Sequence, residues 1–330
     1  MPVVTFTIEA DGKDVTGNIS PYLTEMTITD GEGLEADTLQ IVIDDKDGSV
    51  EPPRTGAVLR AVGGYVGRTR DFGTFCVDSV AYEGYPQRIT IGAQSVAAKE
   101  LAKQKEPKSF TTKDFPTYGD VYAQIAGKLN LSLAMSDKLK SIPNASEFQS
   151  EENGLEFLTR IGAKINAAVT VKSGRLVAVE KGAGQSASGA ALDYILVQRG
   201  TNLISYQVTE KDEPKHSEVE ATYYDRGKNS REVVTTSTGL DGPKFLMRAS
   251  FQEKAEAERA ASAKAKELVR SQADGNFSID GEPFAQAEAY ALVTGIRSRV
   301  DGKWRVKQVV HHFSGSSAYT TDLQCEVPSP

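Results

Sequence analysis

The histidines are the first residues of this sequence that could carry out chemistry. His216, His311 and His312 are the three histidines among 330 residues. His311 and His312 are adjacent in an alternating segment that predicts a β-strand, so their side chains point to opposite faces. Such a pair cannot easily share a metal ion. We interpret these histidines as structural residues.

Two acidic clusters offer further alternatives. The run DDKDG at 44–48 could bind calcium, but no loop with EF-hand spacing follows, and a hairpin turn explains it better. Glu151, Glu152 and Glu156 could imitate the carboxylate pair of a glycosidase. At the start of a predicted helix they are more simply partners of its positive end.

The sequence contains none of the short motifs that carry a known catalytic mechanism. No G-x-S-x-G, H-E-x-x-H or Walker sequence occurs. Gly63, Gly64 and Gly67 do not fit G-x-G-x-x-G, and we attribute them to turns. We therefore assign no catalytic, cofactor-binding or metal-binding residue, and we expect neither a cofactor nor enzyme activity.

Composition limits the classes of partner. The 45 acidic and 38 basic residues give a net charge of −7, which argues against tight nucleic-acid binding because that needs clustered Lys and Arg. No apolar run approaches the ~18 residues of a membrane span, and the N-terminus lacks the basic and apolar regions of a Sec signal. Without an export signal, Cys76 and Cys325 are expected to be reduced, with a disulfide as the less favoured alternative.

The elements that would position these residues are organised around residues 148–181. Ser150 suits a helix N-cap, and an apolar face then recurs at helical spacing. Alternating runs at 167–171 and 175–179 flank Ser173-Gly174 and predict a hairpin. With a helix at 117–128 and a strand at 131–135, they predict a small α+β domain at 105–185, entered through a polar linker at 104–116. We expect this domain to fasten together two β-rich halves.

Short alternating segments with intervening turns predict β structure on both sides of this domain. Residues 1–104 form the first predicted barrel, with a helical segment at 96–103. Residues 186–330 form the second, with a long helix at 251–272 whose alanines predict close docking on a sheet. The fold class is thus mainly β with an α+β insert: two β-barrels, each with a flanking helix, joined by the small α+β domain.

An internal repeat relates the two halves. The segments 73–82 and 302–311 carry glycine, an aromatic residue, two valines and a ring residue at the same spacing. This pattern favours a duplicated barrel. Three such chains in a ring would present six similar barrels, an object with threefold symmetry and pseudo-sixfold geometry. The equivalent pairs are Gly73 with Gly302, Phe75 with Trp304, Val77 with Val306, Val80 with Val309, and Tyr82 with His311.

Three segments together resemble the late control protein D family, the baseplate hub of P2-like phages. The central run, from Gln149 to Lys181, matches the family pattern at several positions. The segment DTLQIVIDDKDG with the following Pro53 and Gly56 resembles the first-barrel strand and acidic turn, and residues 302–326 resemble the closing strand pair. Asn153-Gly154 departs from the pattern, where a helix former would be expected. The matching residues of the central run are Gln149, Glu151, Leu155, Phe157, Leu158, Gly162 and Leu176.

This resemblance implies the fold of contractile-tail hubs and of the N-terminal part of type VI secretion VgrG spike proteins. It implies a homotrimer with two tail-tube-like barrels per chain, adapting a sixfold tail tube to a threefold central spike. The implied partners are the spike protein and the tube protein, together with tape measure and baseplate wedge proteins, with no specific nucleic-acid binding and no stable membrane insertion. An acidic lumen would let DNA pass, although the acidity could equally serve solubility.

The sequence therefore predicts a non-enzymatic hub of a contractile phage tail or tailocin, located in the virion tail baseplate or tailocin particle. Two alternatives stay open. One is a hub component of a type VI or extracellular contractile injection system, for which the same physical arguments hold. The other is a cell-wall-degrading enzyme, which would need a cleft with convergent acid and base groups.

Overall fold

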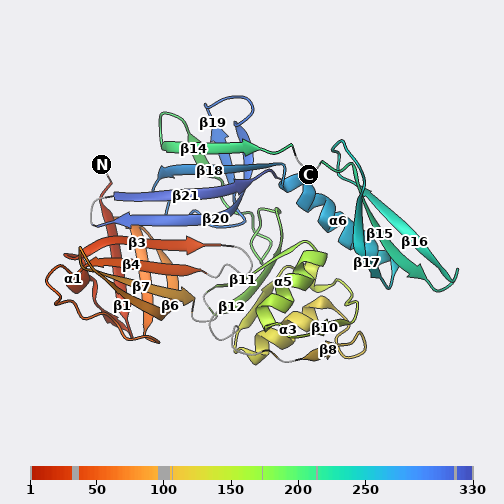
Figure 1. Cartoon of the computed structure of the whole chain (residues 1–330), viewed down its shortest axis with the longest axis horizontal. Helices are drawn as coiled ribbons and strands as arrows, with labels where there is room; N and C mark the ends of the chain where they lie inside the picture. The colour runs from red at the N-terminus through yellow and green to blue at the C-terminus, as the bar shows by residue number, and fades with distance from the viewer. Residues whose placement is uncertain are drawn as a thin grey trace.

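The computed structural model describes residues 2–31, 37–95, 105, 107–172, 174–212, 215–315 and 318–328. Figure 1 shows two β-rich bodies in contact along β3 (Leu23–Asp30) and β20 (Gly302–Ser314), an α+β domain beside them, and a helix-covered sheet at the far end. None of the helices among these residues is long and apolar enough to cross a membrane. The predicted helix at 96–103 lies outside the described residues.

The first barrel is built from alternating strands whose apolar side chains point to one face. Leu39, Ile41 and Ile43 of one strand and Ile89 and Ile91 of its neighbour are all buried. Its strands run in the spatial order β3-β4-β7-β6-β5-β1, with the short strand β2 at the outer edge and helix α1 nearby. The bounds are β1 (Val4–Ala10), β2 (Lys13–Asp14), α1 (Thr16–Ile19), β3 (Leu23–Asp30), β4 (Thr38–Asp44), β5 (Val58–Tyr65), β6 (Arg68–Glu83) and β7 (Arg88–Ser95).

The second barrel repeats this arrangement. Its strands run in the order β14-β18-β21-β20-β19-β13, which matches the first barrel strand for strand. One difference is that β13 pairs parallel with β19, whereas β1 pairs antiparallel with β5. The bounds are β13 (Ile195–Gln198), β14 (Leu203–Glu210), β18 (Ala273–Asp280), β19 (Tyr290–Thr294), β20 (Gly302–Ser314) and β21 (Ala318–Glu326).

The duplication extends to irregularities in the pairing. The β6–β7 register shifts between Val77 and Ser79, and the β20–β21 register shifts between Val306 and Gln308. Both bulges fall at the same place in the repeat that pairs Val77 with Val306. Because a bulge is a specific local feature rather than a consequence of alternation, this coincidence supports a duplicated barrel more strongly than the sequence pattern does.

The two barrels are joined directly through strand pairing. Residues Val309–Ser314 of β20 pair antiparallel with Glu25–Asp30 of β3, so the described strands of both barrels belong to one 13-stranded sheet. Figure 1 shows β20 and β21 lying along β3. The α+β domain does contact both halves, through Lys172 with Asp30 and Gly182 with Glu288. The expectation that it fastens the two halves is incomplete, because the halves are also joined directly by their own strands.

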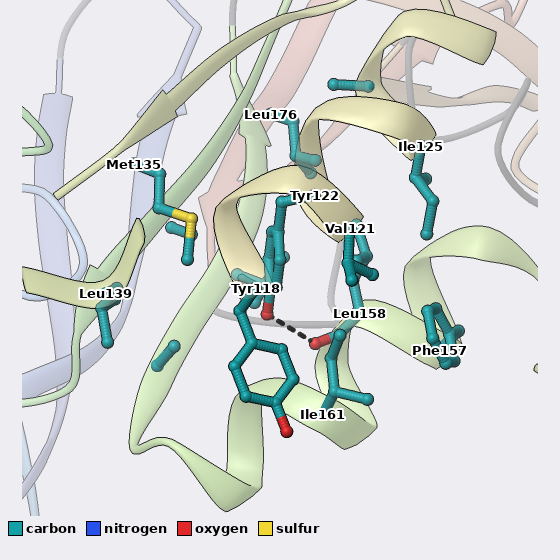
Figure 2. Close-up of a cluster of buried hydrophobic side chains, with 14 of the residues drawn as sticks. Tyr118, Val121, Tyr122, Ile125, Met135, Leu139, Phe157, Leu158, Ile161 and Leu176 are labelled. Atoms are coloured by element: carbon teal, nitrogen blue, oxygen red, sulfur yellow. Dashed lines mark hydrogen bonds between the residues drawn. The ribbon is translucent and has the colours of Figure 1, made fainter. Parts of the chain in front are cut away.

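The α+β domain packs its helices on one face of a three-stranded sheet. Figure 2 shows Tyr118, Tyr122 and Leu158 in its core, where the Tyr122 hydroxyl donates a hydrogen bond of 2.9 Å to the carbonyl oxygen of Leu158. The predicted helix and hairpin are both present. The bounds are β8 (Lys108–Phe110), α3 (Tyr118–Lys128), β9 (Ser132–Met135), α4 (Asp137–Lys140), β10 (Glu147–Gln149), α5 (Gly154–Lys164), β11 (Ala167–Lys172) and β12 (Arg175–Glu180).

Two predictions about this domain need correction. Helix α5 is capped by Asn153 rather than Ser150: the Asn153 side chain accepts from the N–H of Glu156, whose carboxylate accepts from the N–H of Asn153. This reciprocal capping box satisfies donors that the helix start leaves open. The segment 104–116 is also not a free linker, because Lys108–Phe110 forms β8 and Phe110 is buried in the domain core.

The long helix α6 (Lys254–Arg270) docks on a separate sheet, as its alanines predict. Ala257, Ala260 and Ala261 are buried against Val219 and Ala221 of that sheet. The helix is shorter than predicted, because Phe251 ends a strand that the sequence reading missed. The strands are β15 (Glu218–Asp225), β16 (Ser230–Ser237) and β17 (Phe245–Phe251). Helix and sheet thus form an insert between β14 and β18 rather than part of the second barrel wall.

Candidate functional site: the barrel joint and the open strand edges

Aromatic side chains fill the joint between the barrels. Phe313 of β20 and Tyr319 of β21 stack with ring centroids 4.2 Å apart and planes 5° from parallel. Both belong to the apolar core of the first barrel, although they come from the last strand pair of the second. The joint is therefore a shared core and not only a ladder of backbone hydrogen bonds.

A glycine in the first barrel makes room for this stack. A Cβ added at Gly63 in β5 would lie 2.6 Å from Cζ of Phe313. The attribution of Gly63 to a turn is therefore wrong, because it lies inside β5 and permits close approach of a ring. Gly67, with φ of +81°, does occupy the turn between β5 and β6.

Charged side chains close one end of the joint. The carboxylate of Asp30, at the end of β3, accepts from Lys172 of the α+β domain and from Arg70 of β6, the latter at 3.3 Å. Arg70 also donates to the carbonyl oxygen of Ala285 at 2.7 Å, which ties in the second barrel. Burial alone would raise the pKa of Asp30, but the two cations outweigh it and hold this pKa below its usual value. Three parts of the chain therefore meet at one buried carboxylate.

The two neighbouring histidines of β20 have different environments. His311 is buried, and its Nδ1 lies 2.8 Å from the Tyr319 hydroxyl. Burial lowers the pKa of His311 to about 3, so the ring is neutral. His312 points to the opposite face, 3.2 Å from both Glu25 and Asp322. The hydrogen bond to Asp322 raises the pKa of His312, partial burial opposes this, and the hydrogen bond to Glu25 adds to it.

A second buried ion network lies inside the second barrel. The guanidinium of Arg305 donates to Glu288 and to Glu326, and Arg305 is 1% exposed. Arg270 of α6 joins through Glu326, with Nε to Oε1 at 3.1 Å, and also donates to Asn166 of the α+β domain at 3.2 Å. These bonds connect the barrel, the helix insert and the α+β domain.

The outer face of the joined sheet carries small polar side chains. Thr27 and Thr29 of β3, Gln40 of β4, Thr90 of β7 and Gln324 of β21 alternate with buried residues of the same strands. Thr27 and Gln40 lie directly opposite each other on β3 and β4, whereas on β7 Gly92 lies opposite Gln40 and Thr90 lies opposite Val42. This face is continuous across the joint and offers little apolar surface.

The joined sheet has open strand edges at β14 and at the end of β6. Among the described residues, β14 pairs with β18 alone, and Ser79–Glu83 of β6 pair only with β7. Both edges carry exposed apolar side chains: Tyr82 is 70% exposed, and Ile204 and Tyr206 on β14 are also exposed. Unpaired strand edges with apolar side chains readily accept another strand.

The residues considered for chemistry occupy structural positions. Glu156 caps α5, and Glu152 pairs with Arg160 at 2.7 Å. Asp44 and Asp45 accept backbone N–H groups within their turn. The residues that the structure describes contain no group of side chains suited to hold a metal ion. Cys76 and Cys325 are both reduced and form no disulfide with each other.

A groove of about 470 Å³ lies between the α+β sheet and the loop at 182–192. It is lined mostly by apolar side chains, such as Val177 and Val179. Its Lys172 and Glu288 are engaged in the ion pairs with Asp30 and Arg305. The groove therefore does not present these two groups as a free acid and base.

The chain was compared with family models and with curated protein sequences. No family model matches the chain. It is 29% identical to the "Probable baseplate hub protein" of Escherichia phage 186 over 98% of this chain and 92% of that protein. It is also 29% identical to the protein of the same name in Escherichia phage P2, over 96% and 91% of the two chains.

Solved structures share the fold. A tail protein of Neisseria meningitidis MC58 matches with a TM-score of 0.72 and 14% identity, over 98% of this chain and 96% of that one. The 43 kDa tail protein of prophage MuSo2 from Shewanella oneidensis also matches with a TM-score of 0.72, at 13% identity over 98% of both chains. The Francisella PdpA-VgrG complex matches at 0.60 and 10% identity, over 100% of this chain and 59% of that one. The chain therefore resembles the baseplate hub proteins of P2-like phages along nearly its whole length and has the fold of phage tail proteins.

Proposed function

We propose that this protein is the structural baseplate hub of a contractile phage tail or tailocin. The observation that carries the proposal is the pair of barrels with one strand order, joined through β3 and β20 into a single sheet. A tube built from similar barrels needs each barrel to continue the sheet of the one before it. The two barrels of this chain already do so once, within one polypeptide.

The proposed assembly is a homotrimer that sits between a sixfold tail tube and a threefold central spike. Three copies with two barrels each give six similar units around one axis. Tape measure and baseplate wedge proteins are further proposed neighbours, and the proposed location is the tail baseplate. The proposal divides the chain at 1–104, 105–185 and 186–330, with the last strand pair shared between the two barrels.

The proposed role is non-enzymatic and assigns no catalytic, cofactor-binding or metal-binding residues. The polar outer face of the joined sheet would line the channel. This face suits the passage of DNA, because its threonines and glutamines offer no cationic cluster for DNA to bind. Thr27→Lys with Thr90→Lys would place cations on this face. The double variant should gain salt-sensitive DNA binding in a mobility-shift assay, and the wild-type protein should show none at physiological salt.

Light scattering of the purified protein, alone and mixed with its spike protein, tests the assembly. A mass three times that of the chain is expected in at least one of these conditions. A stable dimer in both would count against the hub. A hub of a type VI or extracellular injection system is the second candidate, supported by the shared fold with VgrG, and the genes beside this one would distinguish the two systems.

A further inference from the structure

We propose that neighbouring copies of this chain join edge to edge, with β14 of one copy pairing antiparallel with residues 79–83 of the next. The register would repeat that of the β3–β20 joint inside each chain. This inference rests on the proposed ring of copies and adds to it the two surfaces that meet and the residues that face each other.

Strands β3 and β14 occupy equivalent places in the two barrels. Each is the edge strand of its barrel next to β4 or β18, and each has one pairing irregularity: between Leu23 and Glu25 in β3, and between Leu203 and Ser205 in β14. The sequences LTEMTITD and LISYQVTE then align without a gap, so that Met26 corresponds to Tyr206. The shared irregularity fixes this alignment to the residue.

The terminal carboxylates of these strands strengthen the equivalence. Asp30 ends β3 and pairs with Arg70 at 3.3 Å, and Glu210 ends β14 and pairs with Arg299 at 3.3 Å. Arg70 and Arg299 are separated by the same number of positions as Phe75 and Trp304 in the sequence repeat. The same carboxylate–arginine contact is therefore built at the same corner of both barrels.

Strands β6 and β20 are also equivalent in the two barrels. Val77 exchanges backbone hydrogen bonds with Gly56 and Ala57, and Val306 does the same with Glu288 and Ala289, all at 2.8–2.9 Å. Beyond these valines the two strands differ in one respect. Val309–Ser314 of β20 pair with β3, whereas the equivalent part of β6, Val80–Glu83, pairs only with β7 among the described residues.

These equivalences specify a register. Inside the chain, His311 pairs with Ile28 and Val309 with Asp30. Replacing each residue by its equivalent places Tyr82 of one copy opposite Val208 of the next, and Glu83 opposite Gln207. In this register no like charges lie directly opposite each other, which is a condition for a stable antiparallel pair.

Burial at equivalent positions differs in the way that a missing partner would produce. His311 is fully buried in the joint, whereas its equivalent Tyr82 is 70% exposed. Met26 is fully buried, whereas its equivalent Tyr206 is 42% exposed. Positions that are covered in the joint are therefore uncovered at the two open edges, where they carry the tyrosines Tyr82 and Tyr206. A second copy would supply the complementary edge.

Engineered disulfides test the register. The variant Tyr82→Cys/Val208→Cys, in a background of Cys76→Ser and Cys325→Ala, brings two thiols to directly opposed positions. Their Cα atoms would lie ~4.5–5.5 Å apart, within the range of a disulfide. Mild oxidation of the assembled protein should give covalent dimers and trimers on a denaturing gel. The single-cysteine variants should not, and Tyr82→Cys/Thr209→Cys, whose side chains point to opposite faces, should give much less.

A surface variant provides a second test that does not depend on disulfide geometry. Tyr82→Lys changes an exposed side chain, so the melting temperature of the monomer should be unchanged, but it places an ammonium group against Val208 of the next copy. Association measured by light scattering should weaken at least tenfold. Tyr224→Lys on β15, outside both proposed edges, is the control and should associate normally; Tyr224 is 42% exposed.

The outcomes separate this inference from the proposed function. A trimer by light scattering without the specific cross-link, and with normal association of Tyr82→Lys, overturns the edge pairing and leaves the hub intact. Cross-linked ladders that extend beyond three copies support the edge pairing and contradict the closed trimer. Cross-linking of Tyr82→Cys to a tube or spike protein instead of a second copy overturns the inference.

Discussion

The two barrels share their strand order and bulges but differ in what they bury at equivalent positions. Gly56 and Glu288 both adopt positive φ, at +88° and +69°, where each donates its N–H to a valine carbonyl. Glycine adopts this conformation without strain, whereas glutamate does so at a cost. In the first barrel the neighbouring strand carries Cys76 at the position where the second carries Arg305.

This difference shows which residues belong to the barrel and which belong to its surroundings. The glycine–cysteine combination is sufficient to build the strand pairing. The glutamate–arginine combination adds a buried ion pair that continues to Arg270 of α6, and so it lies where the second barrel meets its insert. The barrel fold tolerates either pair of residues. The glutamate–arginine pair is explained by the docking of the insert on the second barrel.

Equivalent aromatic residues should contribute equally to the two barrels, and this is the largest effect we expect. Phe75 and Trp304 are both buried, and Trp304 lies on the same strand face as the buried Val306. Phe75→Ala and Trp304→Ala should each lower the free energy of unfolding by about 3–5 kcal/mol, measured by urea denaturation. A loss below about 1 kcal/mol for Trp304→Ala alone would show that the second barrel is not packed as the first.

Removing the arginine should cost the second barrel about 3 kcal/mol, because Arg305→Leu takes away the guanidinium that Glu288 and Glu326 share. The triple variant Glu288→Gly/Arg305→Cys/Glu326→Gln copies the first barrel at these positions. It should recover part of the loss in the same denaturation experiment. If the triple variant is less stable than Arg305→Leu, the two barrels are not interchangeable at this site.

Close approach at the joint should make a small substitution harmful. Gly63→Ala would push a methyl group against Phe313, and overpacking of this kind costs roughly 1–3 kcal/mol. Gly127→Ala is the control, because a Cβ there meets nothing within 4 Å and alanine favours helix α3. Thermal unfolding should show opposite shifts for the two variants. Equal shifts would mean that the ring can move aside.

The smallest expected effect is a pH dependence of the joint through His312. Its pKa is raised in the folded state, so its contribution to stability is complete below the ordinary histidine pKa and is lost as pH rises through the raised value. The side chain is partly exposed, so the contribution should stay under about 1 kcal/mol. Melting temperatures between pH 5.5 and 8.5 should fall less for His312→Gln than for the wild type, with His216→Gln as the control.

Local patterns in the sequence predicted the elements of this fold well. Alternation located most strands, helical spacing located α3 and α5, and the alanines of α6 predicted its docking. The true cap of α5 was also readable, since Asn153 and Glu156 have the spacing of a capping box. The polar segment before α3 was misread because its composition outweighed Phe110, one of its two phenylalanines.

Nonlocal contacts were beyond the reach of the sequence. Nothing in the alternation of β3 or β20 indicates that these strands pair with each other. Gly63 similarly resembles a turn residue until Phe313 is placed against it. The β3–β20 joint and the open edges at β14 and β6 depend on such contacts. The sequence repeat suggested an assembly of barrels, but the structure was needed to locate the edges.

The shared strand pair also has a consequence for synthesis on the ribosome. Thr27 and His312 lie in contact at the joint although they are 285 residues apart in the chain. At ~5–20 residues per second, the first barrel would wait roughly 15–60 s for the strands that complete its core. During that interval β3 exposes an unpaired edge, and the nascent chain would depend on chaperones or on its own slow collapse to avoid joining the wrong neighbour.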